Sequence, residues 1–329
     1  MKKRSLILGM LMLGISITAL GEKKIKIIAA HNQTTAESPY QVGLLKFKEI
    51  AEKNPSVEVE VHAGTIGTNE DELLEKLKLG AADVVVVSPG FMTKTGIKEA
   101  DLLALPYLFD NYNHWEKSVD GEIGKEIADI IYNKSKKDFK VIGYWSAGVR
   151  HYYGKKPINT VSDLKGIKIR TQTSGAIGKY WSSLGAIPTN VAWGELYQAL
   201  QQGTVDASEN AYPYFIPMDH HKTNNGKYIS ETGHDYTTRL LIVNGKKFAK
   251  YSLEQQNSII EAAKESVIAE RKSVYEDEDK YKKQAIADGA IVNTLDRKPF
   301  IEFAIPLQDE VAVAIDSKEI LEKIRTVEK

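Results

Sequence analysis

The sequence predicts an α/β protein built from two lobes, and three observations support this. Apolar strand patterns alternate with amphipathic helical patterns along the N-terminal part of the chain, which is typical of an open α/β sheet. The segment 82–87 ends in four successive valines, as expected for a strand buried on both faces. A helical pattern at 253–287 exceeds about 30 residues, far longer than an ordinary helix, so we expect it to span both lobes.

The first elements form strand, helix, strand units. We expect strands at 24–30 and 57–61, separated by a polar loop and a helix at 40–53, and then a helix at 69–79 before the valine-rich strand. In open α/β sheets ligands bind at the carboxyl ends of the strands. The loops at 31–39, 64–70 and 88–90 are therefore candidates for one wall of a site.

The chain then leaves this sheet and returns to it. A strand at 140–145 is followed by further strands and helices up to 235, and an apolar strand resumes at 239–243. This order predicts a second sheet and a cleft at the crossings. We assign residues 22–146 with 236–275 to lobe I, and 147–235 with 276–329 to lobe II.

The N-terminus resembles a secretory signal peptide. Lys2, Lys3 and Arg4 precede an apolar run at 6–20, and small residues precede the expected cleavage site near Gly21. The alternative is a membrane anchor, but the run is shorter than the roughly 20 apolar residues that a span requires. We therefore expect residues 1–21 to be removed and the mature protein to be soluble in the periplasm.

Composition excludes several classes of protein. The chain has no cysteine, so disulfides and a lipid-modified cysteine anchor are impossible. Removing the signal peptide changes 44 basic against 44 acidic side chains to 41 against 44. A mildly acidic protein without a basic stripe is not expected to bind nucleic acid.

No catalytic constellation is evident, so we do not expect an enzyme. The sequence lacks GxSxG, HExxH, P-loop and GxGxxG motifs. His220 and His221 are adjacent, but no further ligand follows at metal-binding spacing, and we expect neither a metal nor a cofactor.

Two arginines are the main site candidates. Arg170 ends the apolar strand at 167–169, and Arg150 lies one predicted strand earlier, where small residues follow the apolar pattern. A guanidinium is always charged and grips a carboxylate in a bidentate way, so the pair predicts an anion-binding cleft. The alternative for each arginine is a surface salt bridge.

Two further residues, Trp193 and Asn210, each have two interpretations. Trp193 either stacks on a ligand or fills the core. Glu209 and Asn210 close a strand-like segment at 204–208, and the Asn210 amide either contacts a polar ligand or caps the turn before Pro213.

The motifs resemble one family. DLKGIKIR at 163–170, ELYQALQ at 195–201, the pair Glu209-Asn210 and LPYLF at 105–109 are similar to segments of the solute-binding proteins of tripartite ATP-independent periplasmic (TRAP) transporters, DctP family. Gly67 and LGAAD at 79–83 occupy the expected upstream places, and the likeness covers nearly all of the mature chain.

The resemblance implies a two-lobed periplasmic binding protein fold with a long helix crossing both lobes, and an organic-anion ligand delivered to the TRAP membrane permease. It implies that Arg170 salt-bridges the ligand carboxylate and that Arg150 assists. It also implies that Asn210 contacts the carboxylate or a neighbouring hydroxyl, and that Trp193 forms part of the site wall.

The chemical class of the ligand is inferred from the residues in the loops. Sialic acid binders of the family carry other residues after the first and third strands, which argues against sialic acid. Polar loop residues that could accept hydroxyl protons favour a sugar acid such as a hexuronate or an aldonate; they are Glu70, Asn69, His31, Asn32 and Glu209. A C4-dicarboxylate is the alternative, a secreted enzyme acting on carbohydrate acids is a remote one, and we expect a monomer.

Overall fold

The computed structural model describes residues 23–67, 69–172 and 175–329. The predicted signal peptide at 1–21 lies outside the described residues. Within these ranges no helix combines the length and the apolar composition needed to cross a membrane.

The strands form one mixed sheet, which the described residues build from nine strands in the order β2-β1-β3-β8-β4-β7-β5-β6, with β9 beside β8. Their bounds are β1 Ile25–His31, β2 Val57–Ala63, β3 Val84–Val87, β4 Phe139–Gly154, β5 Lys168–Thr171, β6 Ile187–Asn190, β7 Ala207–Asn210, β8 Tyr228–Asn244 and β9 Ile291–Asn293. β1 pairs in parallel with β2 and β3, and β5 pairs in parallel with β6 and β7. The long antiparallel pair β4 and β8 joins these two parallel groups.

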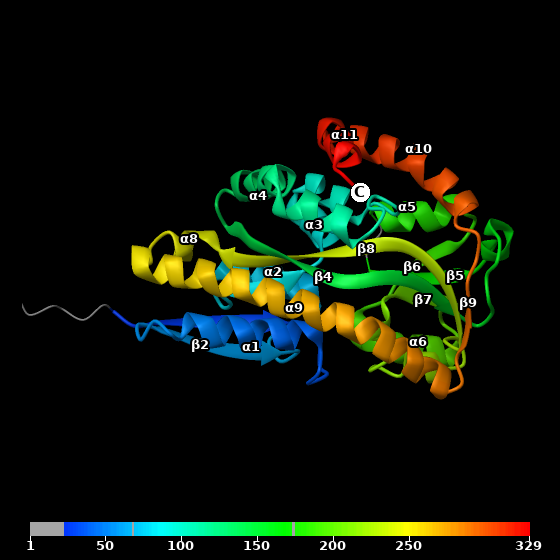
Figure 1. The fold of residues 1–329 in the computed structure, drawn as a ribbon, viewed down its shortest axis with the longest axis horizontal. Helices are drawn as coiled ribbons and strands as arrows, with labels where there is room; N and C mark the ends of the chain where they lie inside the picture. The colour runs from blue at the N-terminus through cyan, green and yellow to red at the C-terminus, as the bar shows by residue number, and fades with distance from the viewer. Residues whose placement is uncertain (1–22, 68, 173–174) are drawn as a thin grey trace, which may run out of the picture.

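Helices cover both faces of the sheet (Figure 1). The α-helices are α1 Pro39–Ala51, α2 Glu70–Leu79, α3 Tyr112–Asp120, α4 Glu122–Lys134, α5 Ala176–Ser183, α6 Leu196–Gln202, α7 Tyr212–Phe215, α8 Gly245–Phe248, α9 Leu253–Ala287, α10 Lys298–Ala314 and α11 Lys318–Thr326. Short 3-10 helices are η1 Pro89–Thr95, η2 Lys98–Ala104, η3 Val161–Leu164, η4 Trp193–Glu195 and η5 His220–Lys222.

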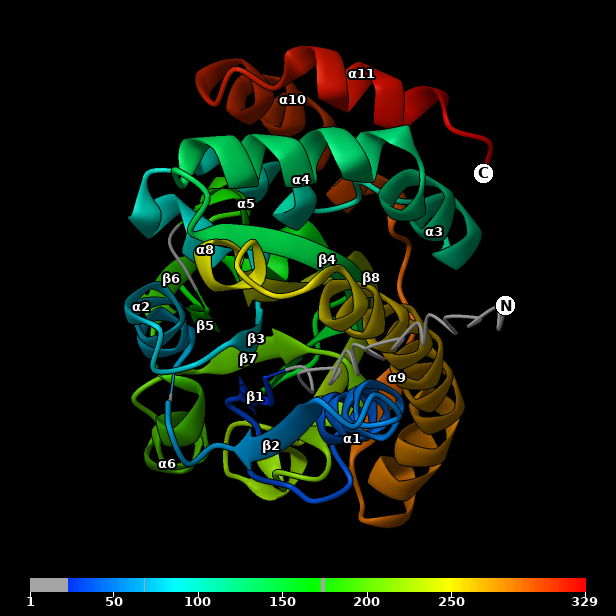
Figure 2. The same ribbon diagram turned by 90° about the vertical axis from the view of Figure 1, so that its left-hand side faces the viewer.

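The core has two parts. One apolar cluster packs the central strands against α3, α4, α5 and α10, and it includes Trp115, Trp181 and Phe300. The other packs them against α1, α6, α7 and α9, and it includes Phe47 and Phe215. Figures 1 and 2 show α10 and α11 on one side of the central strands and α9 on the other.

The long helix α9 confirms the prediction for 253–287. It begins with a capping box in which Ser252 accepts from the Gln255 N–H at 3.1 Å and the Gln255 side chain accepts from the Ser252 N–H. It runs along both parts of the sheet (Figure 1). A single helix of this length therefore connects the two lobes, as predicted.

A bulge interrupts β4 at the middle of the molecule. The register with β8 shifts between Ser146 and Val149, and Gly148 adopts a φ of 76°, which a residue with a side chain rarely adopts. Two carboxylates of α9 hold the bulge: Glu270 accepts from the Ser146 N–H at 3.0 Å and Glu278 accepts from the Val149 N–H at 2.6 Å. The bulge lies at the predicted boundary between the lobes.

Two details of the sequence interpretation are corrected. A separate second sheet was expected, but β4 and β8 pass through both parts of the molecule and make the sheet continuous. The strand predicted at 140–145 was expected to end at Trp145. In the structure the small residues that follow Trp145 form the bulge, and β4 continues to Gly154.

Candidate functional site

A cavity of about 200 Å³ lies at the carboxyl ends of several strands. Its walls come from the ends of β1, β5, β6 and β7, from the start of α2, and from β8. The lining residues are Asn32, Gln33, Tyr40, Asn69, Glu70, Asp71, Phe91, Lys94, Arg170, Gln172, Asn190, Val191, Ala192, Trp193, Asn210, Tyr214 and Arg239. The position is the one where open α/β sheets bind ligands.

Arg170 is a buried cation without a neutralising partner. It is 3% exposed, its Nε donates to the Val191 carbonyl at 2.9 Å, and its Nη1 has no hydrogen-bond partner. It makes no salt bridge with any residue in the described ranges. Burial lowers the pKa of Arg170 to about 10, so the group stays charged at neutral pH. A cation with a free N–H donor at a cavity wall is a site for a carboxylate.

Trp193 lies against this arginine. The Arg170 guanidinium is 5.8 Å from the Trp193 ring centroid, within the range of a cation–π interaction. The indole also contacts His220, with 5.0 Å between ring centroids. Trp193 therefore both lines the cavity and packs into the core beneath it, so the structure combines the two interpretations.

Arg150 has a different environment because it is already paired. Its Nη2 donates to Glu209 Oε1 at 2.8 Å, its Nε contacts Glu209 Oε2, and its Nη1 donates to Asn210 Oδ1 at 3.0 Å. His234 Nε2 lies 3.2 Å from the same carboxylate. Burial disfavours the ionised carboxylate, but Arg150 and His234 outweigh it and hold the pKa of Glu209 at about 2.

Neither member of this ion pair lines the main cavity. Arg150 and Glu209 line a smaller chamber of about 30 Å³ on the far side of Gln172. The Glu209 carboxylate was expected to accept hydroxyl protons from the ligand. Its oxygens instead accept from Arg150 and His234, since β4 and β7 place the pair side by side.

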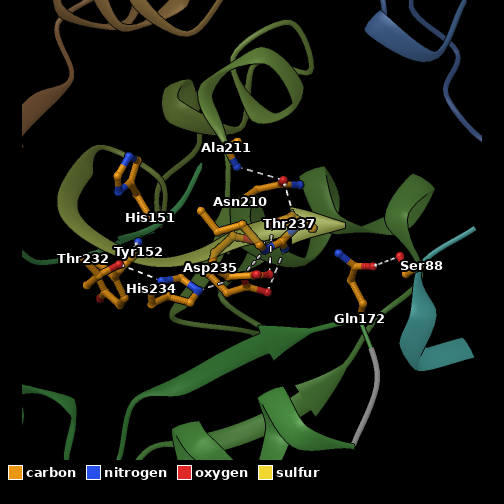
Figure 3. A network of polar contacts seen from close by, with 12 residues as sticks. Ser88, His151, Tyr152, Gln172, Asn210, Ala211, Thr232, His234, Asp235 and Thr237 are labelled. Atoms are coloured by element: carbon orange, nitrogen blue, oxygen red, sulfur yellow. Dashed lines mark hydrogen bonds and ion pairs between the residues drawn. The ribbon is translucent and has the colours of Figure 1, made fainter. Parts of the chain in front are cut away.

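Asn210 presents one end of its amide to the cavity. Its Oδ1 accepts from Arg150 and from the Ala211 N–H at 2.9 Å, as Figure 3 shows for Ala211. The amide nitrogen is thus the group that Asn210 can offer to a ligand, as a donor. From the sequence alone, either the oxygen or the nitrogen of the Asn210 amide could have faced the ligand.

Three predicted residues lie around the first loops. Glu70 and Asn32 line the cavity, and both are buried. Glu70 occupies the first turn of α2, where the helix dipole favours a carboxylate, and it accepts from the Ser88 N–H. His31 does not line the cavity: its Nδ1 accepts from the Gln33 N–H at 3.1 Å, and its Nε2 lies 2.9 Å from Gln41 Oε1.

Arg239 and Gln172 were not predicted, although both line the main cavity and the smaller chamber. Arg239 is 5% exposed and donates to the Thr238 carbonyl at 3.0 Å and to the Tyr40 hydroxyl. A charged residue at the start of the apolar run RLLIV was the signal that could have identified it. Among the described residues no three His, Asp or Glu side chains are arranged to hold a metal ion.

Comparison with known proteins identifies the family. The model of the family described as bacterial extracellular solute-binding protein, family 7 (DctP), matches residues 29–314. The chain belongs to this family. Its members act as TRAP solute-binding proteins without catalytic activity, which confirms the interpretation of the sequence as a binding protein.

Two curated relatives match most of the chain. A C4-dicarboxylate-binding periplasmic protein of Rhodobacter capsulatus is 27% identical over 94% of this chain and 93% of its own length. A 2,3-diketo-L-gulonate-binding periplasmic protein of Escherichia coli is 27% identical over 91% of each chain.

Solved structures support the two-lobed fold. A TRAP periplasmic solute-binding protein of Roseobacter denitrificans with bound β-D-glucuronate has a TM-score of 0.86 and 26% identity, covering 92% of this chain and all 100% of its own. One of Polaromonas with bound D-erythronate has a TM-score of 0.86 and 28% identity, covering 93% of this chain and 100% of its own.

Proposed function

We propose that this TRAP solute-binding protein captures a sugar acid, such as a hexuronate or an aldonate, by closing its lobes around it, and delivers it to the membrane permease. The observation that carries the proposal is the unpaired Arg170 at the cavity wall. A buried charge is costly without a partner, so a ligand carboxylate that pairs with Arg170 stabilises the closed form.

The charge of the cavity favours one carboxylate over two. Its lining has three cationic and two anionic side chains: Lys94, Arg170 and Arg239 against Glu70 and Asp71. Lys94 and Asp71 form a salt bridge between partly exposed side chains and so neutralise each other. The remaining net charge of one positive unit matches a monoanion, whereas a dicarboxylate would leave an uncompensated negative charge in a buried site.

The rest of the lining suits hydroxyl groups. Glu70 can accept from ligand hydroxyls, Asn32 and Asn69 offer amides, and the Asn210 amide nitrogen can donate. The Trp193 ring supplies a flat apolar surface of the kind that packs on a sugar ring. The relatives with bound glucuronate and erythronate are consistent with this proposal. The C4-dicarboxylate-binding relative keeps the dicarboxylate as the alternative.

We further propose a periplasmic monomer whose signal peptide is cleaved near Gly21. The lobes follow the predicted boundaries, with residues 22–146 and 236–275 in lobe I and 147–235 and 276–329 in lobe II. The bulge in β4 and the carboxylates of α9 that hold it support a hinge at this boundary.

A ligand screen on residues 22–329 tests the proposal. A ligand that binds only the folded protein stabilises it by RT ln(1 + [L]/Kd), about 2.7 kcal/mol at a hundredfold excess over Kd. We expect thermal shifts with D-glucuronate, D-galacturonate or aldonates, and smaller ones with succinate or malate. Larger shifts with the dicarboxylates would favour the alternative.

The same samples test the enzyme alternative. We expect every acid that binds to be recovered unchanged after prolonged incubation, as measured by mass spectrometry. Loss of the acid over time would contradict the assignment as a binding protein. A complete absence of shifts would contradict the sugar acid and the dicarboxylate alike.

A further inference from the structure

Ser88 and Gln172 meet although they follow strands on opposite sides of the central pair. Ser88 directly follows β3, and Gln172 directly follows β5, while β8, β4 and β7 lie between these two strands in the sheet. The Ser88 hydroxyl and the Gln172 amide are nevertheless 2.7 Å apart (Figure 3). The contact therefore bridges the two parts of the molecule that the long strands connect.

The Gln172 amide also contacts the arginines. Guanidinium groups only donate hydrogen bonds, so the amide oxygen must face them. In this orientation it accepts from Arg150 Nη1 at 3.0 Å and from Arg239 Nη2 at 3.2 Å, while its nitrogen donates to Ser88 Oγ at 2.7 Å. The Gln172 side chain thus contacts one arginine on β4, another on β8, and the serine that follows β3.

We propose that the hydrogen bond between Ser88 and Gln172 is a clasp that holds the closed arrangement, and that Gln172 is a positioning residue that slows ligand release. The inference rests on the proposed function, because it requires that the lobes close around a ligand. Gln172 lines the ligand cavity, so it joins the ligand site to the bridge between the lobes.

Ser88 extends the clasp to another ligand-site residue. Its backbone N–H donates to the Glu70 carboxylate, and Glu70 lines the cavity from the start of α2. The continuous path runs from Glu70 through Ser88 and Gln172 to Arg150 and Arg239. A ligand that contacts Glu70 on one wall of the cavity and an arginine on the other wall therefore lies between the two ends of this hydrogen-bonded path.

A second contact reinforces the same bridge. The Asp101 carboxylate, on η2, accepts from the N–H of Ala176 at 2.8 Å. Ala176 begins α5, a few residues after Gln172. Gly175 allows this approach, because a Cβ there would overlap the Asp101 carboxylate. Two polar contacts from the η1 and η2 side thus reach the segment after β5, one at Gln172 and one at Ala176.

Ser88→Ala is the sharpest test of the clasp. Ser88 lines only the small chamber and not the ligand cavity, so its hydroxyl does not touch a ligand placed at Arg170. Losing one hydrogen bond corresponds to roughly a threefold to tenfold change in an equilibrium constant. The clasp forms only after the ligand has entered the cavity. We therefore expect Ser88→Ala to raise the ligand dissociation rate roughly threefold to tenfold and to leave the association rate unaltered.

The rates can be measured by stopped-flow tryptophan fluorescence with D-glucuronate, or with the acid that binds wild type best. Ser118→Ala is the matched control, because Ser118 is also buried and its hydroxyl donates within α3, to the His114 carbonyl at 2.7 Å. An unchanged dissociation rate in Ser88→Ala, or an equal increase in Ser118→Ala, would overturn the proposal.

Cross-linking separates the clasp from the choice of ligand. The chain has no cysteine, so Ser88→Cys combined with Gln172→Cys creates a unique thiol pair. A short thiol-specific cross-linker should join the two within one chain, and faster with ligand, while each single variant stays unlinked. Absence of the internal cross-link would refute the clasp. Cross-linking in the double variant, together with no binding of any acid by wild type in the ligand screen, would support the clasp and refute the proposed function.

Discussion

Arg150 and Glu209 satisfy one another across neighbouring strands, with Arg150 Nη2 donating to Glu209 Oε1 at 2.8 Å. Arg170, in the strand on the other side of β7, has no such partner. The two arginines therefore differ in their pairing. Glu209 neutralises Arg150, whereas Arg170 lines the cavity without a salt-bridge partner among the described residues.

Removing the Arg170 charge should abolish binding and spare the fold. In Arg170→Ala we expect Kd to rise at least about thirtyfold, because truncating one partner of a buried, hydrogen-bonded charge pair costs roughly 2–5 kcal/mol. Unfolding in urea should show no loss of stability, since the wild-type guanidinium is buried without an anionic partner. Isothermal titration with D-glucuronate measures the affinity.

Arg170→Lys should also weaken binding, because lysine keeps the charge and loses the bidentate fork. Arg325→Ala serves as the control, since Arg325 pairs with Asp309 on the surface, far along the chain from the cavity residues. Retained affinity in Arg170→Ala would show that the carboxylate binds elsewhere.

Breaking the Arg150–Glu209 pair should instead damage the fold. Removing one partner of a buried ion pair leaves an uncompensated charge and costs about 3–5 kcal/mol. We expect Arg150→Met and Glu209→Gln each to lower the urea midpoint strongly. The double variant should lose less than the sum of the two, because it leaves neither charge unpaired. Strictly additive losses would contradict the pairing.

Glu270 should make stability depend on pH. It is fully buried on α9 and accepts from the Ser146 N–H, while its Oε1 has no hydrogen-bond partner among the residues that the structure describes. Burial raises the pKa of Glu270 from 4.5 to about 8. The native state therefore keeps a proton that the unfolded state releases. The resulting stabilisation is complete below pH 4.5 and is lost as the pH rises through 8.

The measurement is urea unfolding between about pH 4 and pH 9, a range that encloses both pKa values of Glu270, 4.5 and about 8. Glu270→Gln removes the titrating group. We expect the free energy of unfolding to fall by about 3–5 kcal/mol less in this variant than in wild type as the pH rises. Glu261→Gln is the control, because Glu261 lies on the exposed side of the same helix. A parallel decline in wild type and Glu270→Gln would show that another group carries the pH dependence.

The elements of the fold were predictable where their signals are local. The helix at 253–287 follows from its long helical pattern, which is rich in Ala, Glu and Lys, and the valine strand follows from its continuous apolar run. The continuity of the sheet was not predictable, since the small residues at the β4 bulge look like the end of a strand. Only the pairing of β4 with β8 carries the strand past Gly148.

The sequence alone determined that this chain has an α/β fold, a family and an arginine after its central strand motif, because periodicity and motifs depend on neighbours along the chain. Only the tertiary structure decided which charges are available to a ligand. Glu209 neutralises Arg150 from another strand, β8 brings Arg239 into the cavity, and His31 contacts Gln41 instead of the cavity. Burial and pairing depend on residues far apart in sequence, so no local pattern could assign them.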